Sequence, residues 1–191
     1  MAYLLITGSA HFTVDLDALE KMDVTSRAKR FARLAHSSIN HVRKYSGQRY
    51  TVHTEEVARL VAATGVDDAT VAAALLHDVI EDKGVTETTL RPIFGDDITS
   101  LVLEVTNISR SEDGNRQYRK ALDLAHIANA SNRGQSIKAA DIIENTCDLL
   151  NNDPAFSLVY FPEKLAQLGV LNEANPALLK KAYANIHQHN H

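Results

Sequence analysis

Four ionisable residues lie close together directly after an apolar segment: His77, Asp78, Glu81 and Asp82. If this segment is one continuous helix, the rotation of about 100° per residue places the four side chains within roughly 140° of one side. Three carboxylates at such short spacing repel one another and resist removal from water. A bound divalent cation would reverse this penalty, because it favours the ionised carboxylates. The cluster therefore predicts a metal-dependent site.

Two more distant residues are candidates to complete this site. His53 lies upstream of the cluster and Asp141 lies downstream, each in a segment with helical features. Taken singly, His53 could cap or bridge structural elements, and Asp141 could be a solvated helix residue. Together with His77 and Asp78 they would supply two imidazoles and two carboxylates. That set suits manganese, zinc or iron better than magnesium, which prefers oxygen ligands. We expect these side chains to converge.

The segments that must position these residues have helical periodicity after about the first twenty residues. Two apolar stripes at i, i+3 and i+4 spacing predict core-facing helices; they are Val57, Leu60 and Val61, and Ile98, Leu101, Val102 and Val105. Val71–Leu76 is apolar on every side, which is typical of a buried helix. We expect that helix to continue through Asp82 and to stop at Lys83 and Gly84. Convincing strand alternation is absent.

Loops and the C-terminal half can also be outlined. Residues 45–50 and 109–115 contain Gly, Ser, Asp or Asn and are predicted to be loops. A helix is expected over 137–150, ended by Asn, Asp and Pro at 151–154, and a last helix over 175–187. The alternating histidines at the extreme C-terminus are more typical of a frayed polar end than of a metal site.

Composition restricts the class of protein. The chain has 191 residues, 45% of them hydrophobic, and a net charge of −4, so no global positive field attracts nucleic acid or anionic lipid. The single Cys147 cannot form an internal disulfide and is expected to be buried. No basic segment precedes the short apolar start, and no stretch approaches the roughly 18 apolar residues of a membrane span. We therefore expect a cytoplasmic protein without membrane or nucleic-acid partners; its oligomeric state is left open.

Several longer motifs resemble those of a known family. The segment Ala73–Asp82 matches the signature A-A-L-L-H-D-V-I-E-D in full, and Gly47–Thr54 is similar to a loop of the form G-E-P-Y-I-x-H-P. Ile137–Asp141 stands where that family has a form like I-K-L-A-D, and Asn145 matches an asparagine four residues later. The chain thus resembles the HD superfamily. Within it, the chain is similar to the hydrolase domain of bifunctional alarmone synthetase-hydrolases and to their small single-domain relatives.

The resemblance implies a fold and a metal site. The expected fold is an all-α helical bundle, a single HD domain over residues 1–191 with the core of the resemblance at 31–150 and a helical extension at 151–191. The implied cofactor is a divalent metal, Mn²⁺ in this family. The implied ligands are His53, His77, Asp78 and Asp141.

The resemblance also suggests roles for residues around the metal. Glu81 and Asp82 are implied to orient or deprotonate the attacking water, and their spacing after His77-Asp78 supports this. The implied substrate-binding residues are Arg43, Lys44, Lys138 and Asn145. For Lys44 and its neighbour Arg49, a solvated surface position is an equally good interpretation. Four positions depart from the family pattern: Arg49, Thr54, Ile142 and Glu144 replace Pro, Pro, Arg and His.

The leading hypothesis for function is hydrolysis of a nucleotide phosphate or pyrophosphate ester. By resemblance, its specific form removes pyrophosphate from the 3′ position of guanosine tetra- or pentaphosphate, a small-molecule nucleotide. One alternative is an HD phosphohydrolase that acts on another nucleotide, such as a monophosphate. A second is a nucleotide-sensing module without catalysis. Glu81 and Asp82 argue against that module, because pure binding does not require two more carboxylates beside the ligands.

Overall fold

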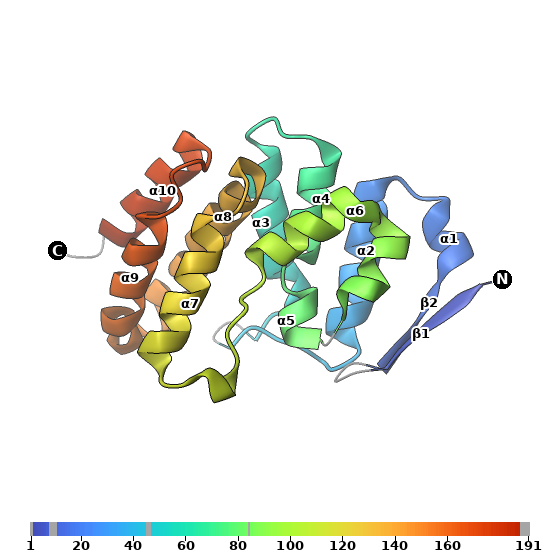
Figure 1. Ribbon diagram of the computed structural model, residues 1–191, viewed down its shortest axis with the longest axis horizontal. Coiled ribbons are helices and arrows are strands. Elements are labelled where there is room, and N and C mark those ends of the chain that lie inside the picture. Colours follow the sequence, from blue (N-terminus) through green and yellow to red (C-terminus); the bar gives the residue numbers. More distant parts are fainter. Residues whose placement is uncertain (1, 8–10, 45–46, 84, 188–191) are drawn as a thin grey trace.

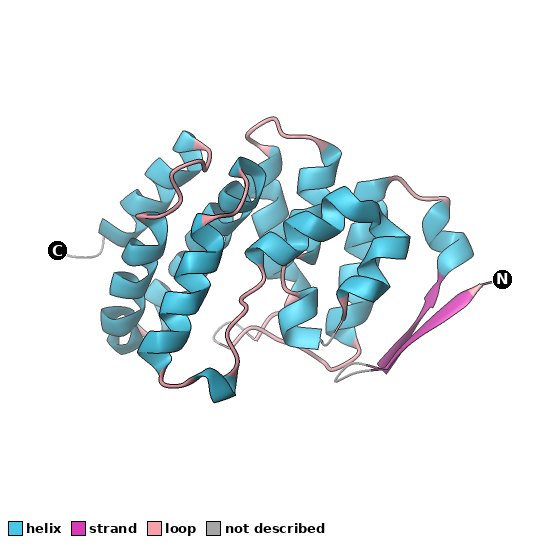
Figure 2. Ribbon diagram, in the orientation of Figure 1, coloured by secondary structure: helices cyan, strands magenta, loops and turns pink. Residues whose placement is uncertain are grey.

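A computed structural model describes residues 2–7, 11–44, 47–83 and 85–187, which form a β-hairpin followed by a helical bundle (Figures 1 and 2). Its strands are β1 (Tyr3–Thr7) and β2 (His11–Asp15). Its α-helices are α1 (Leu16–Glu20), α2 (Val24–Ser37), α3 (Thr51–Ala62), α4 (Asp68–Leu76), α5 (Val79–Lys83), α6 (Glu87–Val105), α7 (Arg116–Ala128), α8 (Asn132–Asn152), α9 (Pro154–Leu168) and α10 (Pro176–His187). A short 3₁₀ helix, Ser111–Asp113, precedes α7. The expected all-α bundle is confirmed, with the hairpin as an addition.

The hairpin corrects the expectation that the chain has no strands. β1 and β2 pair antiparallel from Tyr3 opposite Asp15 to Thr7 opposite His11. Ile6, Phe12 and Val14 are buried. On the outer side, however, Tyr3 and Leu5 are apolar and exposed. β1 therefore lacks the usual alternation of apolar and polar residues in a half-buried strand. Without this alternation, the sequence does not predict a strand here.

The centre of the bundle is formed by α2, α3, α4 and α8, where α4 packs on both α2 and α3 and α3 packs on α8. The two predicted apolar stripes, on α3 and α6, are buried as expected. Phe31 on α2 is fully buried and makes edge-to-face contacts with Phe12 and Phe94. Figure 1 shows the hairpin at one end of the molecule and α9 and α10 at the other, so the chemistry-bearing segments of α3, α4 and α8 lie between them.

The helix that carries the central cluster is interrupted, contrary to the prediction of one continuous helix. α4 ends at Leu76, residues His77 and Asp78 form a turn, and α5 begins at Val79. The Nδ1 atom of His77 donates a hydrogen bond of 2.8 Å to the carbonyl oxygen of Ala74. A continuous helix would offer that carbonyl to the N–H of residue 78, so the side chain competes with the helical bond. His77 and Asp78 therefore project from a junction between two helices.

Two of the C-terminal helices, α8 and α10, agree closely with the predicted ones, and α9 lies within the predicted helical extension. α8 contains the predicted helix at 137–150 and ends before Asp153, whose carboxylate accepts a hydrogen bond of 3.1 Å from the N–H of Phe156 and so caps α9. α10 corresponds to the helix expected at 175–187 and packs on α8 and α9. None of the described helices is both long and apolar enough to cross a membrane.

Two smaller sequence interpretations have different outcomes. Cys147 is exposed and not buried, because it lies at the margin of the contact between α8 and α10, where Asn185 Nδ2 lies 3.1 Å from its sulfur. Of the alternating histidines, His187 closes α10, whereas His189 and His191 lie outside the described residues.

Candidate metal centre

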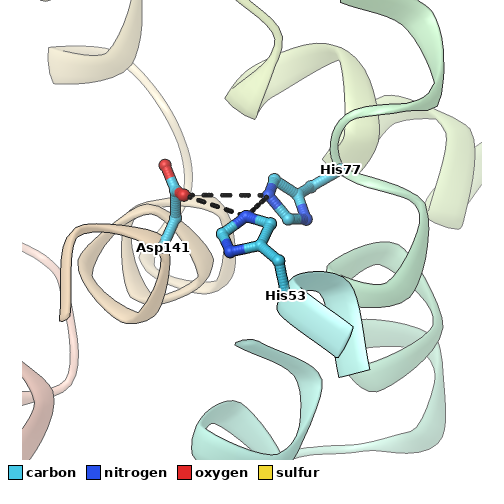
Figure 3. Close-up of side chains that lie close together, drawn as sticks. All are labelled: His53, His77 and Asp141. Atoms are coloured by element: carbon cyan, nitrogen blue, oxygen red, sulfur yellow. Dashed lines mark hydrogen bonds and ion pairs between the residues drawn. The ribbon is translucent and has the colours of Figure 1, made fainter. Parts of the chain in front are cut away.

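Three of the predicted ligands meet although they come from distant segments (Figure 3). His53 projects from α3, His77 from the α4–α5 turn and Asp141 from α8, and one ligand atom from each lies within 4.8 Å of the others. The two Nε2 atoms are 3.2 Å apart, and His53 Nε2 is 3.4 Å from Asp141 Oδ1. All three residues are buried. The predicted convergence of these side chains is therefore present.

The fourth predicted ligand, Asp78, faces the same two imidazoles. Its Oδ2 atom lies 3.0 Å from His77 Nε2 and 3.4 Å from His53 Nε2. The hydroxyl of Tyr50 donates a hydrogen bond of 2.7 Å to this same oxygen and so fixes the carboxylate. Tyr50, at the start of α3, was not predicted as a site residue, although it belongs to the loop motif that carried the resemblance.

The imidazoles are oriented so that both Nε2 atoms serve as potential ligands. His77 Nδ1 is engaged with the Ala74 carbonyl, and His53 Nδ1 is hydrogen-bonded to the carboxylate of Glu144. If each Nδ1 carries the proton, both Nε2 lone pairs face each other and the carboxylates of Asp78 and Asp141. Such a set of acceptors requires positive charge between its members. The donor set therefore fits a divalent cation well.

The electrostatics of these side chains lead to the same conclusion. Burial lowers the pKa of His53, but the carboxylates of Asp141, Asp78 and Glu144 outweigh burial and raise it well above its usual value. Burial likewise lowers the pKa of His77, but the neighbouring carboxylates, Asp78 foremost, again raise it. The carboxylates thus favour positive charge on the imidazoles. A cation can supply that charge in place of the protons, so we expect metal binding to release protons and to strengthen as pH rises.

Asp141 is held in place by two neighbours on α8. Lys138 Nζ lies 3.2 Å from its Oδ2 atom, and Asn145 Nδ2 donates a hydrogen bond of 2.5 Å to Oδ1. Burial raises the pKa of Asp141, but Lys138 and the two imidazoles outweigh it and hold the pKa far below its usual range. Asp141 is therefore ionised, and Lys138, whose pKa is raised by Asp141, Glu81 and Asp78 against the effect of burial, is charged.

The two predicted water-activating residues lie on α5, next to the site. Glu81 accepts hydrogen bonds from the backbone N–H of Asn107 at 2.5 Å and from Asn107 Nδ2 at 2.9 Å. Its carboxylate is exposed, and it is close enough to Lys138 to raise the pKa of that lysine. The backbone of Asp82 is part of α5, but its side chain lies outside the described part of the structure.

Two predicted substrate residues, Arg43 and Lys44, line a cavity of about 360 Å³. Its other lining residues are Tyr50, Asn145, Leu149, Phe156 and Tyr160. Arg43 is buried and its Nη1 atom forms a 2.6 Å ion pair with Glu144, whereas Lys44 is exposed and its Nζ atom lies 5.5 Å from the centre of the Phe156 ring. The cavity thus combines aromatic walls with cations.

A second cavity, of about 370 Å³, is lined by Lys138, the residue that pairs with Asp141. It is also lined by two lysines that sequence analysis missed, Lys120 on α7 and Lys164 on α9. Burial, with the neighbouring charges of Lys138 and Lys120, lowers the pKa of Lys164 to about 8. Lys164 lies outside the motifs of the resemblance. The only signal for Lys164 was its i, i+4 spacing from Tyr160, which lines the first cavity.

Known proteins resemble this chain in sequence and in fold. A family model described as HD domain matches residues 28–149. The chain is 37% identical over 107 residues to the guanosine-3′,5′-bis(diphosphate) 3′-pyrophosphohydrolase of Drosophila melanogaster. This match covers 55% of this chain and 58% of that protein. The chain is 35% identical over 112 residues to a probable enzyme of the same name from Mycoplasma pneumoniae, covering 54% of this chain and 15% of that protein. The chain thus spans less than two thirds of the length of these relatives.

A solved structure has a similar fold. It is described as a metazoan ortholog of SpoT that hydrolyses ppGpp and plays a role in starvation responses. It superposes with a TM-score of 0.78 at 27% identity, over 88% of this chain and 97% of that one. The similarity of fold therefore extends over most of the chain.

Proposed function

This chain belongs to the HD domain family, and on this premise we propose that it is a metal-dependent hydrolase of a nucleotide phosphate or pyrophosphate ester. The observation that carries the proposal is the convergence of His53, His77 and Asp141, with the carboxylate of Asp78 close to both imidazoles. Two cavities lined by cationic side chains each include a residue that contacts Asp141. The proposed substrate is guanosine 3′,5′-bis(diphosphate), the compound in the names of the relatives. The proposed products are guanosine 5′-diphosphate and pyrophosphate.

The proposed ligands of the ion are His53, His77, Asp78 and Asp141. A bound divalent cation would polarise a phosphoryl oxygen and lower the pKa of a water molecule. Glu81 and Asp82 are proposed to orient that water and to accept its proton. The water oxygen then attacks the phosphorus atom next to the ribose, the bond from phosphorus to the 3′ oxygen breaks, and the 3′ oxygen takes up a proton.

The aromatic cavity suits the nucleoside. Tyr50, Phe156 and Tyr160 line it and offer ring faces and edges to a purine. Asn145 lies in the same cavity and also contacts Asp141, so a nucleoside bound here would place its 3′ substituent beside the proposed metal. Lys44 is proposed to contact the substrate at the edge of this cavity, where its Nζ atom lies close to Phe156.

The lysine-lined cavity suits phosphate groups. Lys120, Lys138 and Lys164 line it, and Lys138 also contacts Asp141. A chain of phosphates that begins at the proposed metal would reach these lysines next, and ammonium groups bind phosphate oxygens well. The two cavities, which each include a residue that contacts Asp141, therefore favour a substrate with both a nucleoside and a polyphosphate.

Finer features of the proposal follow from the resemblance. Manganese is the proposed ion, a small nucleotide the proposed partner, and the cytoplasm the proposed location. The alternatives, a phosphohydrolase of nucleoside monophosphates and a non-catalytic nucleotide sensor, predict different results in the experiment below.

The experiment is a panel of nucleotides incubated with the full-length protein and Mn²⁺, with released phosphate and pyrophosphate measured separately. We expect pyrophosphate release from guanosine 3′,5′-bis(diphosphate) and none after the ion is removed by a chelator. Phosphate release from a monophosphate alone would replace the proposed substrate by the first alternative. Tight binding of a nucleotide without release of either product would support the sensor.

Lys164 gives the proposed phosphate site a pH dependence that can be tested. Because its folded-state pKa is about 8, Lys164 is charged below this pH and loses its charge above it. Loss of one charged hydrogen-bond donor costs about 1.5–3 kcal/mol, so KM for the polyphosphate is expected to rise about tenfold or more between pH 7 and pH 9.5. The groups that surround it are Lys120 and Asp123 on α7, Lys138 and Asp141 on α8, and Glu163 on α9.

The matched variant is Lys164→Arg, which keeps its charge across this range. Its KM should stay nearly constant between pH 7 and pH 9.5, because arginine is not deprotonated there. Lys138 stays charged in both proteins, since its pKa is raised. An equal rise of KM in the arginine variant would show that another group titrates and that Lys164 does not contact phosphate.

A further inference from the structure

Glu144 is one of the four positions where the chain departs from the family pattern, and it contacts a proposed metal ligand. It lies on α8, one turn after Asp141. Its Oε2 atom is hydrogen-bonded to His53 Nδ1 and is also 2.6 Å from Arg43 Nη1. The side chains of Arg43 and His53 are only 6% and 1% exposed, and that of Glu144 is 16% exposed. One oxygen of Glu144 therefore links the buried guanidinium of Arg43 to the buried imidazole of His53.

The contact with His53 determines how that imidazole presents itself. A carboxylate only accepts hydrogen bonds, so it requires a proton on Nδ1 of His53. In the neutral ring that binds a metal, the lone pair then lies on the remaining nitrogen, Nε2, which faces His77 Nε2 at 3.2 Å and Asp141 Oδ1 at 3.4 Å. A carboxylate on the far side of a ligating imidazole also increases electron donation to the metal and fixes the orientation of the ring. Glu144 thus has the contacts expected of a group that orients a ligand.

The contact with Arg43 explains how Glu144 is kept in place. A buried carboxylate without a partner would turn towards water, and the guanidinium offsets its charge. Arg43 Nη1 contacts the same oxygen that contacts His53, so the cation holds this oxygen against the imidazole. The resemblance had assigned Arg43 to the substrate. Its burial and its short ion pair with Glu144 point instead towards the metal site.

We propose that Glu144 is a positioning residue for His53 and that Arg43 acts through Glu144 and not by contact with the substrate. The inference rests on the metal site proposed above, but not on the identity of the substrate. It predicts that both residues determine the affinity for the ion. A substrate contact would instead determine KM alone.

The test measures the affinity of the full-length, metal-free protein for Mn²⁺ by competition with a chelating dye. Glu144→Gln should weaken binding about 10- to 100-fold, the usual effect of losing a group that orients a metal ligand. Arg43→Gln should weaken it in the same direction. The double variant should lose no more than Glu144→Gln alone, because the two residues act in one chain of contacts. The control Glu56→Gln removes the same charge from a carboxylate that pairs with Arg59 and should bind as the wild type does.

A second measurement needs no variant. In the Zn²⁺-loaded wild-type protein, ring ¹⁵N shifts of His53 should show a proton on Nδ1 and the metal on Nε2. Metal on Nδ1, or wild-type Mn²⁺ affinity in Glu144→Gln, would overturn the inference. Wild-type affinity in Arg43→Gln together with a raised KM would overturn the role of Arg43. A wild-type protein that binds Mn²⁺ but hydrolyses no nucleotide would contradict the proposed function and leave this inference standing.

Discussion

Replacement of His77 by alanine is expected to abolish binding of the divalent ion and to reduce nucleotide hydrolysis to the uncatalysed background. His77 Nε2 lies 3.2 Å from His53 Nε2 and 3.0 Å from Asp78 Oδ2, at the centre of the proposed ligand set. Its loss leaves one imidazole and two carboxylates among the proposed ligands. Metal content by elemental analysis and product release with Mn²⁺ present are the two measurements.

A histidine outside the site provides the control. His126 on α7 is half-buried and its Nε2 atom hydrogen-bonds the carbonyl oxygen of Leu103 at 3.0 Å. His126→Ala should therefore retain the metal. Mn²⁺ should raise the melting temperature of the wild type and of His126→Ala, because a ligand that binds only the folded state stabilises it. Mn²⁺ should leave the melting temperature of His77→Ala unchanged. Full metal content in His77→Ala would remove His77 from the proposed ligands.

The composition of the candidate site could be predicted from the sequence, because metal ligands are chemically distinctive. His77 and Asp78 stood out as charged residues at the end of an apolar segment, and the resemblance then suggested His53 and Asp141. Their convergence depends on the packing of α3 and α8 around α4, which the apolar stripes indicated only in part. Motif and resemblance together were sufficient to predict the candidate ligands, since each lies inside a motif.

The supporting residues could not be predicted in the same way, because their roles depend on three-dimensional packing. Glu144 appeared only as a departure from the family pattern, and Arg43 as a candidate substrate contact. Lys164 and Tyr160 lie on α9, and nothing in their spacing shows which side of that helix faces α8. The break after Leu76 was equally hidden. Helix propensity continues through it, and the hydrogen bond from His77 to Ala74 that accompanies it is visible only in the structure.

Glu81 is held in a defined position although it is exposed. Asn107, in the segment that follows α6, donates one backbone and one side-chain hydrogen bond to the two carboxylate oxygens of Glu81. These two bonds fix the rotamer of Glu81. Glu81 lies one turn after His77. Its negative charge is close enough to Lys138, beside Asp141, to raise the pKa of that lysine. A carboxylate placed in this way can bind a water molecule at the edge of the proposed metal site, without contact with the proposed ion.

Replacing Glu81 or Asp82 by the corresponding amide is therefore expected to separate catalysis from metal binding. Turnover should fall by about 10²- to 10⁴-fold in Glu81→Gln and in Asp82→Asn, the usual contribution of a general acid or base. Metal occupancy should stay nearly intact, because neither residue is a proposed ligand. The measurement is pyrophosphate release from guanosine 3′,5′-bis(diphosphate) with Mn²⁺, alongside metal analysis of each variant. Glu87→Gln, an exposed carboxylate that pairs with Arg91, is the control and should keep wild-type turnover. Near wild-type rates in both amide variants would leave the metal site in place but would assign activation of the water to other groups.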